Sequence, residues 1–318
     1  MHCSGRRPVS VQVHMIQIGV DLGGTKIEAA AFEAGQELLR RRIATPQGDY
    51  AAVVVAVRDL VLGLEREIGR TATVGIGTPG AVSPGSGLIK NSNSTALNGK
   101  PFVQDAASAL ARPVRVANDA NCFALSEAID GAGAGHRTVF GVILGTGVGG
   151  GLVLADQLWS GRNAIAGEWG HMEMPRRTEH DLPVRRCYCG RQNCVETFLS
   201  GPAVALEHRH RTGLDLDTET IAAMAKSGDA DAADTIENFY RRLARALAGV
   251  INVVDPDIVV LGGGLSNIDD IYASVPPMLA EQVFSDTFST PIVKNVHGDS
   301  SGVRGAARLW DRALLNGS

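Results

Sequence analysis

The densest group of reactive side chains lies between residues 187 and 196. Cys187, Cys189 and Cys194 are three of the five cysteines and fall within eight positions. Gly190 lets the chain turn tightly between them. Three thiolates leave one place in a tetrahedral zinc shell, which His171 would fill. Free buried thiols are the alternative, but thiols clustered at this spacing are typical of a metal site. The pattern predicts a structural zinc, because four protein ligands leave no place for a reacting water.

Two glutamates flank this predicted zinc site. Glu168 precedes His171 by three residues, and Glu196 follows Cys194 by two. Isolated glutamates are usually solvated surface residues. If zinc ties the two segments together, however, both carboxylates point to one place. Paired carboxylates suit the vicinal hydroxyls of a sugar.

A glycine turn follows the first apolar strand. Asp21 stands at the end of the strand, and Gly23, Gly24, Thr25 and Lys26 follow it. The backbone N–H groups of such a turn can approach phosphate oxygens closely. Thr25 and Lys26 add a hydroxyl and a cation, and Asp21 could hold Mg²⁺ directly or through water. An ordinary hairpin turn is the alternative. A dinucleotide site for redox chemistry ranks last, since the run contains no GxGxxG.

Later glycine turns repeat this chemistry. Gly145, Thr146 and Gly147 follow another apolar strand, and two phosphate-binding turns suit a triphosphate. Gly263 and Gly264 follow a third strand, where an adenine or ribose could lie against bare backbone. A plain strand-to-helix turn explains this last pair equally well.

Asn118 and Asp119 stand where an apolar strand meets a helix. The commonest role of Asn or Asp at such a junction is to cap the helix. The functional alternative is a general base that accepts a proton from an attacking hydroxyl in phosphoryl transfer. Both can hold, because a cap fixes a carboxylate at the C-terminal end of a strand, where α/β proteins bind ligands.

The elements that must position these residues alternate between strand and helix. The loop at 79–100 is long enough to suggest a function, and residues 156–197 are predicted to be irregular. A coarse similarity between 20–25 and 143–148 suggests two related lobes that face one cleft. Strands are predicted at 16–21, 27–32, 38–43, 73–77, 114–117, 139–144, 152–155, 258–261 and 291–296, and helices at 49–69, 102–111, 119–128, 269–284 and 303–315, with most of 198–254 also helical.

Composition limits the class of protein. The 318 residues carry a net charge of −4 without a basic block, which gives no support for binding to nucleic acid or an anionic membrane. No apolar run is long enough to span a bilayer. Residues 1–14 lack the apolar region of a signal peptide, and we expect a disordered extension before a natural start at Met15. An odd cysteine count with clustering fits a reduced, cytoplasmic compartment.

Taken together, the motifs resemble the ROK family of sugar kinases and repressors over about residues 15–316. They are Asp21-Leu22-Gly23-Gly24-Thr25-Lys26, Asn118-Asp119, the run from Leu144 to Gly151, Glu168-Trp169-Gly170-His171, and Cys187-Tyr188-Cys189-Gly190 with Cys194 and Glu196. The sequence departs from the family pattern at Asn193, where a glycine normally precedes the third cysteine. Asn tolerates a left-handed backbone, so we expect the turn to survive.

The resemblance implies a two-lobed α/β fold of the actin/hexokinase/Hsp70 (ribonuclease H-like) type, with a central cleft and a zinc-binding loop. Residues 15–118 would form one lobe, joined by the closing helix 303–316. Residues 119–302 would form the other, with the zinc loop and a helical insertion. The family also implies a homodimer.

The implied activity is ATP-dependent phosphorylation of the 6-hydroxyl of a hexose. The segments 91–102, 187–190, 196–198 and 297–302 look most like bacterial fructokinases of the manno(fructo)kinase type, so D-fructose is the expected substrate. Residues 118–128 and 145–151 are also similar to N-acetylglucosamine kinases, which keeps that sugar, glucose and mannose as alternatives. A sugar-sensing regulator is the alternative of another class, but residues 1–14 are too short for a helix-turn-helix.

The resemblance also implies residue roles. Asp119 would be the general base, and Asn118, Glu168, His171 and Glu196 would hold the other sugar hydroxyls. His171 would bind zinc through one ring nitrogen while its other N–H faces the sugar. Gly80 and Asn93 belong to the loop that would close over the sugar, and Mg²⁺ would accompany ATP at Asp21.

Overall fold

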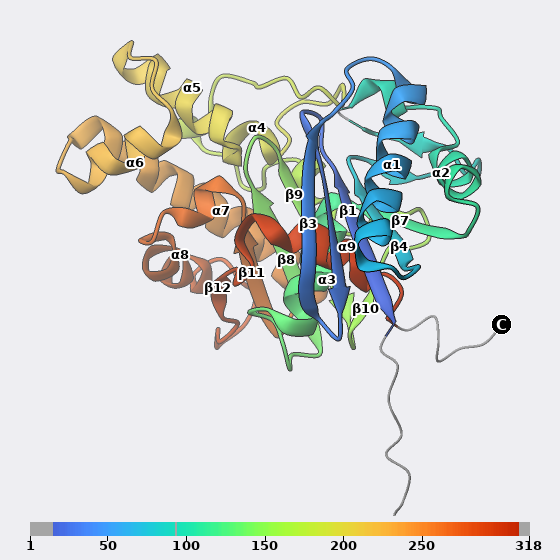
Figure 1. Cartoon of the computed structure of the whole chain (residues 1–318). Helices are drawn as coiled ribbons and strands as arrows, with labels where there is room; N and C mark the ends of the chain where they lie inside the picture. Colours follow the sequence, from blue (N-terminus) through green and yellow to red (C-terminus); the bar gives the residue numbers. More distant parts are fainter. Residues whose placement is uncertain (1–14, 93, 312–318) are drawn as a thin grey trace, which may run out of the picture.

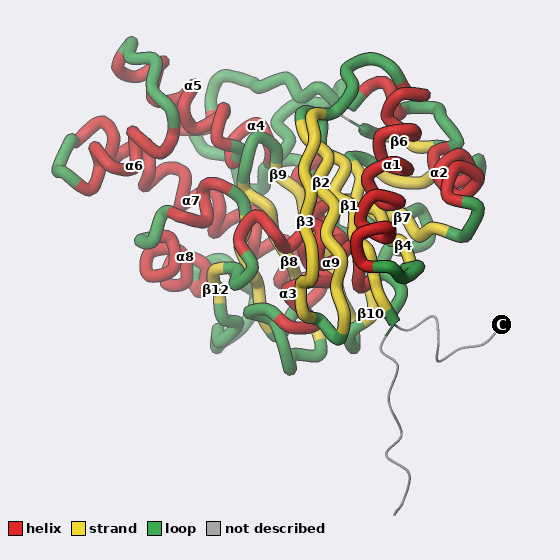
Figure 2. The backbone as a smooth tube through the Cα atoms, in the orientation of Figure 1, coloured by secondary structure: helices red, strands yellow, loops and turns green. Residues whose placement is uncertain are grey.

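The computed structural model describes residues 15–92 and 94–311. The predicted N-terminal extension, Asn93 and the end of the predicted closing helix lie outside the described residues. Two five-stranded sheets stand side by side, with helices between them and on their outer faces (Figure 1). Helices, strands and loops along the backbone are distinguished in Figure 2.

The first sheet has the order β3-β2-β1-β4-β7. β1 (Ile16–Leu22), β2 (Lys26–Glu33) and β3 (Gln36–Ala44) correspond to three predicted strands and form an antiparallel meander. β4 (Thr73–Thr78) and β7 (Val114–Asn118) continue the sheet in parallel. α1 (Tyr50–Ile68) and α2 (Phe102–Leu110) pack against this sheet through one shared apolar core. The Asp49 side chain caps α1, accepting from Ala52 N at 3.0 Å.

The second sheet repeats the plan with the order β10-β9-β8-β11-β12. β8 (Thr138–Leu144) and β9 (Val148–Leu154) form an antiparallel hairpin, extended by β10 (Gln157–Leu158). β11 (Ile258–Gly262) and β12 (Ile292–Lys294) are parallel to β8. The sequence similarity between 20–25 and 143–148 therefore reflects equivalent positions: each segment forms the hairpin turn, β1–β2 or β8–β9, of one of the two sheets.

α3 (Asp119–Asp130) and α9 (Ser301–Arg308) cross between the two sheets (Figure 1). Glycine permits the approach: a Cβ on Gly305 would lie 1.7 Å from the Cys122 carbonyl oxygen. On the sheet side, Cβ atoms on Gly19 and Gly75 would each lie 1.8 Å from a carbonyl oxygen of α9. Cys122 is fully buried on α3.

The remaining helices gather on the outer side of the second sheet. They are α4 (Glu196–Leu199), α5 (Gly201–Thr212), α6 (Thr218–Lys226), α7 (Ala230–Val254) and α8 (Ile271–Ala280). α7 buries an apolar stripe against this sheet and its neighbouring helices. In the part of the chain that the structure describes, no helix is both long and apolar enough to cross a membrane.

Several predicted elements differ from the structure. The predicted 79–100 loop contains the hairpin β5 (Ala81–Val82) to β6 (Ile89–Lys90) and the 3-10 helix η1 (Thr95–Leu97). The irregular 156–197 segment holds β10 and the short helices η2 (Trp169–His171) and η3 (Glu179–Asp181). The closing helix begins at Ser301 and, among the described residues, ends at Arg308. The assignment of residues 15–118 and 119–302 to separate lobes stays a prediction.

Candidate functional site

Asn118 caps α3, and Asp119 is the first residue of that helix. Asn118 Oδ1 accepts from Ala120 N at 2.9 Å, which confirms the predicted cap. Its amide nitrogen donates to the Gly80 carbonyl oxygen at 3.1 Å and thereby fixes the start of the 79–100 segment. The Asp119 carboxylate accepts from Ala120 N at 2.8 Å. Burial raises the pKa of Asp119, and the charge of Glu168 raises it further.

Asp21 lies at the end of β1, on the same side of the molecule as Asp119. The pKa of its carboxyl is raised to about 6, first by burial and then by the charges of Asp119 and Glu28. Lys26 and Arg42 act in the opposite direction. Asp21 and Asp119 therefore repel one another, and a divalent cation between them would relieve that repulsion.

The turn from β1 to β2 is a tight hairpin. Gly23 N donates to the Lys26 carbonyl oxygen at 3.0 Å. Gly24, Thr25 and Lys26 are exposed and available to a ligand. This geometry suits a phosphate-binding turn and an ordinary hairpin equally well, so the predicted contacts of these residues with nucleotide stay a prediction.

Glu168 and His171 flank an anchored tryptophan. Trp169 is buried, and its Nε1 donates to the Gly149 carbonyl oxygen at 2.9 Å. A side chain on Gly150 would collide with the indole, so β9 needs glycine there. Burial raises the pKa of the Glu168 carboxyl, as does the charge of Glu196, while His171 lowers it. The structure thus brings Glu168 and Glu196 close enough for the charge of one carboxylate to shift the pKa of the other.

Glu196 begins α4 and reaches the turn between β8 and β9. Its Oε2 accepts from Val148 N at 2.9 Å. A Cβ on Gly147 would lie 2.8 Å from the same oxygen, so a larger residue would displace the carboxylate. Glu196 thereby links the segment 187–194, which carries the three cysteines and is called the cysteine loop below, to the Gly145–Gly147 turn. The position of Glu196 in the sequence did not reveal this contact.

His171, Cys187, Cys189 and Cys194 form the predicted cluster. Their candidate ligand atoms lie within 4.8 Å of one another. Cys187 Sγ is 3.6 Å from His171 Nδ1, and the sulfurs of Cys189 and Cys194 are also 3.6 Å apart. Ligands about 2.3 Å from a tetrahedral ion would stand about 3.7 Å apart, so the residues fit zinc. Asn193 takes the expected left-handed backbone, with φ 55°.

The second ring nitrogen of His171 faces a tyrosine. Nε2 lies 3.0 Å from the Tyr188 hydroxyl, and the two rings meet edge to face. We expected this nitrogen to face a sugar, and its direct contact with sugar stays a prediction. Tyr188 carried no signal in the sequence beyond standing between two cysteines.

A pocket of about 750 Å³ opens beside the β8–β9 turn. Gly145, Thr146 and Gly264 line it, so three residues predicted to bind nucleotide meet there. Gly263 adjoins it with φ 81°, and a Cβ there would strike the Leu144 carbonyl oxygen. Helices α5 and α6 supply the opposite wall, which sequence reasoning missed because helical periodicity does not mark a pocket. Those wall residues include Gly201, Pro202, Ala205, Thr218, Glu219, Ala222, Ala223 and Lys226.

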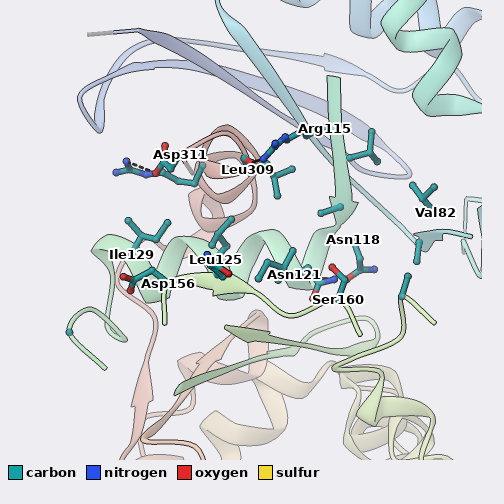
Figure 3. Close-up of a pocket in the computed structure, with 18 residues that line it drawn as sticks. Val82, Arg115, Asn118, Asn121, Leu125, Ile129, Asp156, Ser160, Leu309 and Asp311 are labelled. Carbon is teal, nitrogen blue, oxygen red and sulfur yellow. Dashed lines mark hydrogen bonds and ion pairs between the residues drawn. The ribbon is translucent and has the colours of Figure 1, made fainter. Parts of the chain in front are cut away.

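A second pocket of about 1140 Å³ lies along the flank of α3 (Figure 3). Arg115, Asn121, Leu125 and Leu309 line it, and Asn118 stands at its edge. Asp119, Glu168, His171 and Glu196 are not among its lining residues. Although this pocket is larger than the one beside the β8–β9 turn, its size alone therefore does not identify it as the active site.

A family model described as the ROK family matches residues 17–313. The chain belongs to the ROK family. An N-acetyl-D-glucosamine kinase of Vibrio cholerae is 42% identical over 296 residues, which cover 92% of this chain and 98% of that relative.

Two solved ROK structures share the fold. The ROK hexokinase from Thermus thermophilus matches with a TM-score of 0.84 at 28% identity, covering 95% of this chain and 100% of that one. A ROK glucokinase from Streptomyces griseus, in complex with glucose and AMPPNP, matches with a TM-score of 0.75 at 28% identity, covering 92% and 98%. The predicted hexokinase-like α/β fold and the ROK sugar kinase assignment are confirmed at this level, whereas fructose as substrate is not.

Proposed function

We propose that this ROK protein is an ATP-dependent hexose kinase whose preferred acceptor is the 6-hydroxyl of N-acetyl-D-glucosamine. The observation that carries the proposal is Asp119: a half-buried carboxylate at the start of α3, whose pKa is raised by desolvation and by the charge of Glu168, and whose own charge raises the pKa of Asp21. Support for the sugar comes from the Vibrio cholerae relative at 42% identity. D-Fructose, first favoured from the sequence, becomes the alternative, together with glucose and mannose.

The nucleotide would occupy the 750 Å³ pocket. Adenine and ribose would lie between α5, α6 and the Gly263–Gly264 turn, with the phosphates over Gly145, Thr146 and Gly147. Asp21 would hold Mg²⁺ on the terminal phosphates, directly or through water. Thr25 and Lys26 would approach from the first sheet, with backbone N–H groups of Gly23 and Gly24.

The hexose would lie between Asn118, Glu168, His171 and Glu196, with the 79–100 segment above it. Its 6-hydroxyl would point at Asp119, which accepts the proton as O6 attacks the γ-phosphorus of ATP. The new O6–P bond forms while the bond from that phosphorus to the β,γ-bridging oxygen breaks and ADP leaves. A raised pKa makes Asp119 a stronger base than a solvated carboxylate.

Zinc bound by the Cys/His cluster would supply a structural cross-link. Two residues of the cluster lie next in the chain to the proposed sugar-binding carboxylates: His171 follows Glu168 on η2, and Cys194 precedes Glu196 at the start of α4. Holding these segments together fixes the two carboxylates on either side of the sugar.

The expected homodimer stays a prediction.

A coupled assay of ADP production tests the proposal. N-acetylglucosamine, glucose, mannose and fructose should all be offered with Mg·ATP at the same concentrations. The expected result is the highest kcat/KM with N-acetylglucosamine. Turnover with fructose above the other three would restore the first substrate expectation, and hexose binding without ADP production would favour a sugar-sensing regulator.

A further inference from the structure

The turn from β1 to β2 has its carbonyl oxygens engaged on one side. The Gly23 carbonyl oxygen accepts from Thr45 Oγ1 at 2.8 Å, and that of Gly24 accepts from Gln47 Nε2 at 2.7 Å. In a trans peptide the N–H points away from the preceding C=O, so the N–H groups of Gly24 and Thr25 point away from these partners. Among the described residues, neither N–H group has an acceptor. The turn therefore presents two free donors, which suits the oxygens of a phosphate.

Ser94 meets this turn from the segment that would cover the sugar. A Cβ on Gly24 would lie 3.3 Å from Ser94 Oγ, so the hydroxyl stands directly beside the turn. Ser94 is half-buried and is the N-cap residue of η1. A serine at this position normally accepts a backbone N–H with its side-chain oxygen, but Ser94 makes no such bond. The hydrogen bonds that Ser94 forms with described residues all involve its backbone, which leaves the hydroxyl for a ligand.

The backbone of Ser94 is fixed on both sides. Its N–H donates to Ser92 Oγ at 3.1 Å, and its carbonyl oxygen accepts from Leu97 N at 3.0 Å. Ser92 is buried and is held by the side-chain amide of Asn98, which accepts from Ser92 N at 2.9 Å and donates to the Ser92 carbonyl oxygen at 2.8 Å. The place of the Ser94 hydroxyl is therefore set before a ligand binds, and a preorganised donor costs a ligand little ordering entropy.

We propose that the Ser94 hydroxyl binds the terminal phosphate of the nucleotide as a hydrogen-bond donor, together with the N–H groups of Gly24 and Thr25. The inference rests on the proposed function, because it brings the β1–β2 turn to the terminal phosphates. An O–H donor to an anionic oxygen makes a short and strong hydrogen bond. Because Ser94 belongs to the 79–100 segment, the segment over the hexose also contacts the phosphoryl group that is transferred. ADP lacks this phosphate and makes no contact with Ser94.

Ser94→Ala tests the contact, since it removes only the hydroxyl. Calorimetry with Mg²⁺ and saturating N-acetylglucosamine should compare the binding of AMPPNP with that of ADP. The Kd for AMPPNP should rise about tenfold, because a hydrogen bond to a charged group is lost, while the Kd for ADP stays as in the wild type. In the coupled assay, kcat/KM for ATP should fall by a similar factor, and the KM for hexose should not change.

Ser86→Ala is the matched control, because Ser86 is exposed between β5 and β6 of the same segment. It should bind both nucleotides like the wild type. An equal Kd for AMPPNP in Ser94→Ala and the wild type would overturn the proposal. Equal losses of affinity for AMPPNP and ADP would also overturn it, since the hydroxyl would then not distinguish the terminal phosphate.

The binding measurement needs no turnover and is therefore separate from the proposed function. If the wild type binds sugar and nucleotide but makes no ADP, the kinase proposal fails, while weaker binding of AMPPNP by Ser94→Ala still supports the phosphate contact. If the wild type phosphorylates hexose and both proteins bind AMPPNP equally, only the role of Ser94 is refuted.

Discussion

Position 119 combines a capped helix start with a carboxylate whose pKa is raised by burial. The raised pKa would favour catalysis, because it makes the carboxylate a stronger base, but it lowers the stability of the fold at a pH where the carboxylate is charged. A carboxyl whose folded pKa lies above its unfolded value of 3.8 binds more protons in the native state between the two values. The free energy of unfolding therefore falls as pH rises through that window.

Asp119→Asn should lower kcat about 10²- to 10⁴-fold, because it would remove the proposed general base. The same change should raise the melting temperature at pH 7.5, where the wild-type carboxylate is charged and poorly solvated. The gain should shrink as pH falls and vanish below pH 3.8, where the wild-type group is protonated in both states. Thermal melts from pH 3 to 8 and the coupled assay measure both effects.

Asp59→Asn is the control for this variant. Asp59 is exposed on α1 and pairs with its neighbour Arg58, so neither kcat nor its pH dependence should change. Full activity in Asp119→Asn would refute the role of Asp119 as base. A melting temperature below that of the wild type at pH 7.5 would contradict the electrostatic account.

Local residue types predicted part of this site. Asn118 was expected to cap the helix and does, because a strand-to-helix junction leaves N–H groups that an Asn side chain can satisfy. The four residues of the Cys/His cluster, whose side chains the structure brings together, were found from spacing alone. The bond from Glu196 to Val148 N joins residues 48 apart, and such a contact depends on how α4 packs against the β8–β9 turn. No local pattern encodes that packing.

The cysteine loop is anchored at two places. At one end stands the Cys/His cluster. At the other, the buried Asp181 accepts from Arg242 Nε at 2.7 Å and from Arg245 Nη2 at 2.9 Å, which holds η3 against α7. Arg185 adds a bond to Glu207 on α5 at 3.0 Å. Loss of metal should therefore loosen the loop between Arg186 and Arg191 without releasing η3.

Cys189→Ser should lower the zinc content and expose that loop to trypsin. Cleavage is expected after Arg186 and Arg191, which are exposed, before any cleavage after Arg185 or Arg245. The KM for hexose should rise roughly tenfold or more, because the residues around the metal lose their fixed orientation. Peptide mapping by mass spectrometry and metal analysis check the outcome, and adding EDTA to the wild type should reproduce it. Equal resistance to trypsin in variant and wild type would contradict the structural role.

Glu127 holds the joint between α3 and α9. Its fully buried carboxylate accepts from Ser301 Oγ at 2.8 Å and from three backbone N–H groups, those of Ala132, Val296 and His297, at 3.0–3.2 Å. Glu127→Gln would turn an N–H₂ donor toward N–H groups. We expect a loss of about 2–4 kcal/mol in the free energy of unfolding, measured in urea.

The exposed Glu237→Gln is the matched control for the α3–α9 joint. Among the described residues, the ion pair of Glu237 is with Arg241, one helical turn away on α7, and the change should stay within about 0.5 kcal/mol. If Glu127→Gln proved equally mild, the joint would depend on the glycine contacts rather than on this carboxylate.

Strands were predicted better than the loops between them. β1, β2 and β8 are apolar runs that end at glycine turns, and their positions are confirmed within a few residues. The β5–β6 hairpin was missed because strands of two residues have no periodicity to detect. α8 continues through Pro276 and Pro277 in the middle of its range but ends at Ala280, before the predicted end. Tertiary packing on α7 decides that boundary rather than local propensity.

At the scale of the whole molecule, the two halves would contribute different parts of the proposed reaction. Every residue lining the 750 Å³ pocket lies between Gly145 and Asp270. Asp21 and the β1–β2 turn belong to the first sheet and do not line it. Transfer of a phosphoryl group at Asp119 would therefore need the two sheets to approach each other. α3 and α9, which cross between the sheets, are the elements about which they would turn (Figure 1).

Binding of hexose and nucleotide together should close the molecule. Small-angle X-ray scattering should show a smaller radius of gyration with N-acetylglucosamine and AMPPNP together than with either alone, because both sites must be filled to hold the sheets together. ATP hydrolysis without hexose should then be at least about a hundredfold slower than phosphorylation, since water alone does not drive closure. Arabinose, which lacks the 6-hydroxyl and the acetamido group, serves as a control sugar and should not compact the protein. An unchanged radius of gyration combined with sugar-independent ATP hydrolysis would show that the site is already assembled in the open molecule.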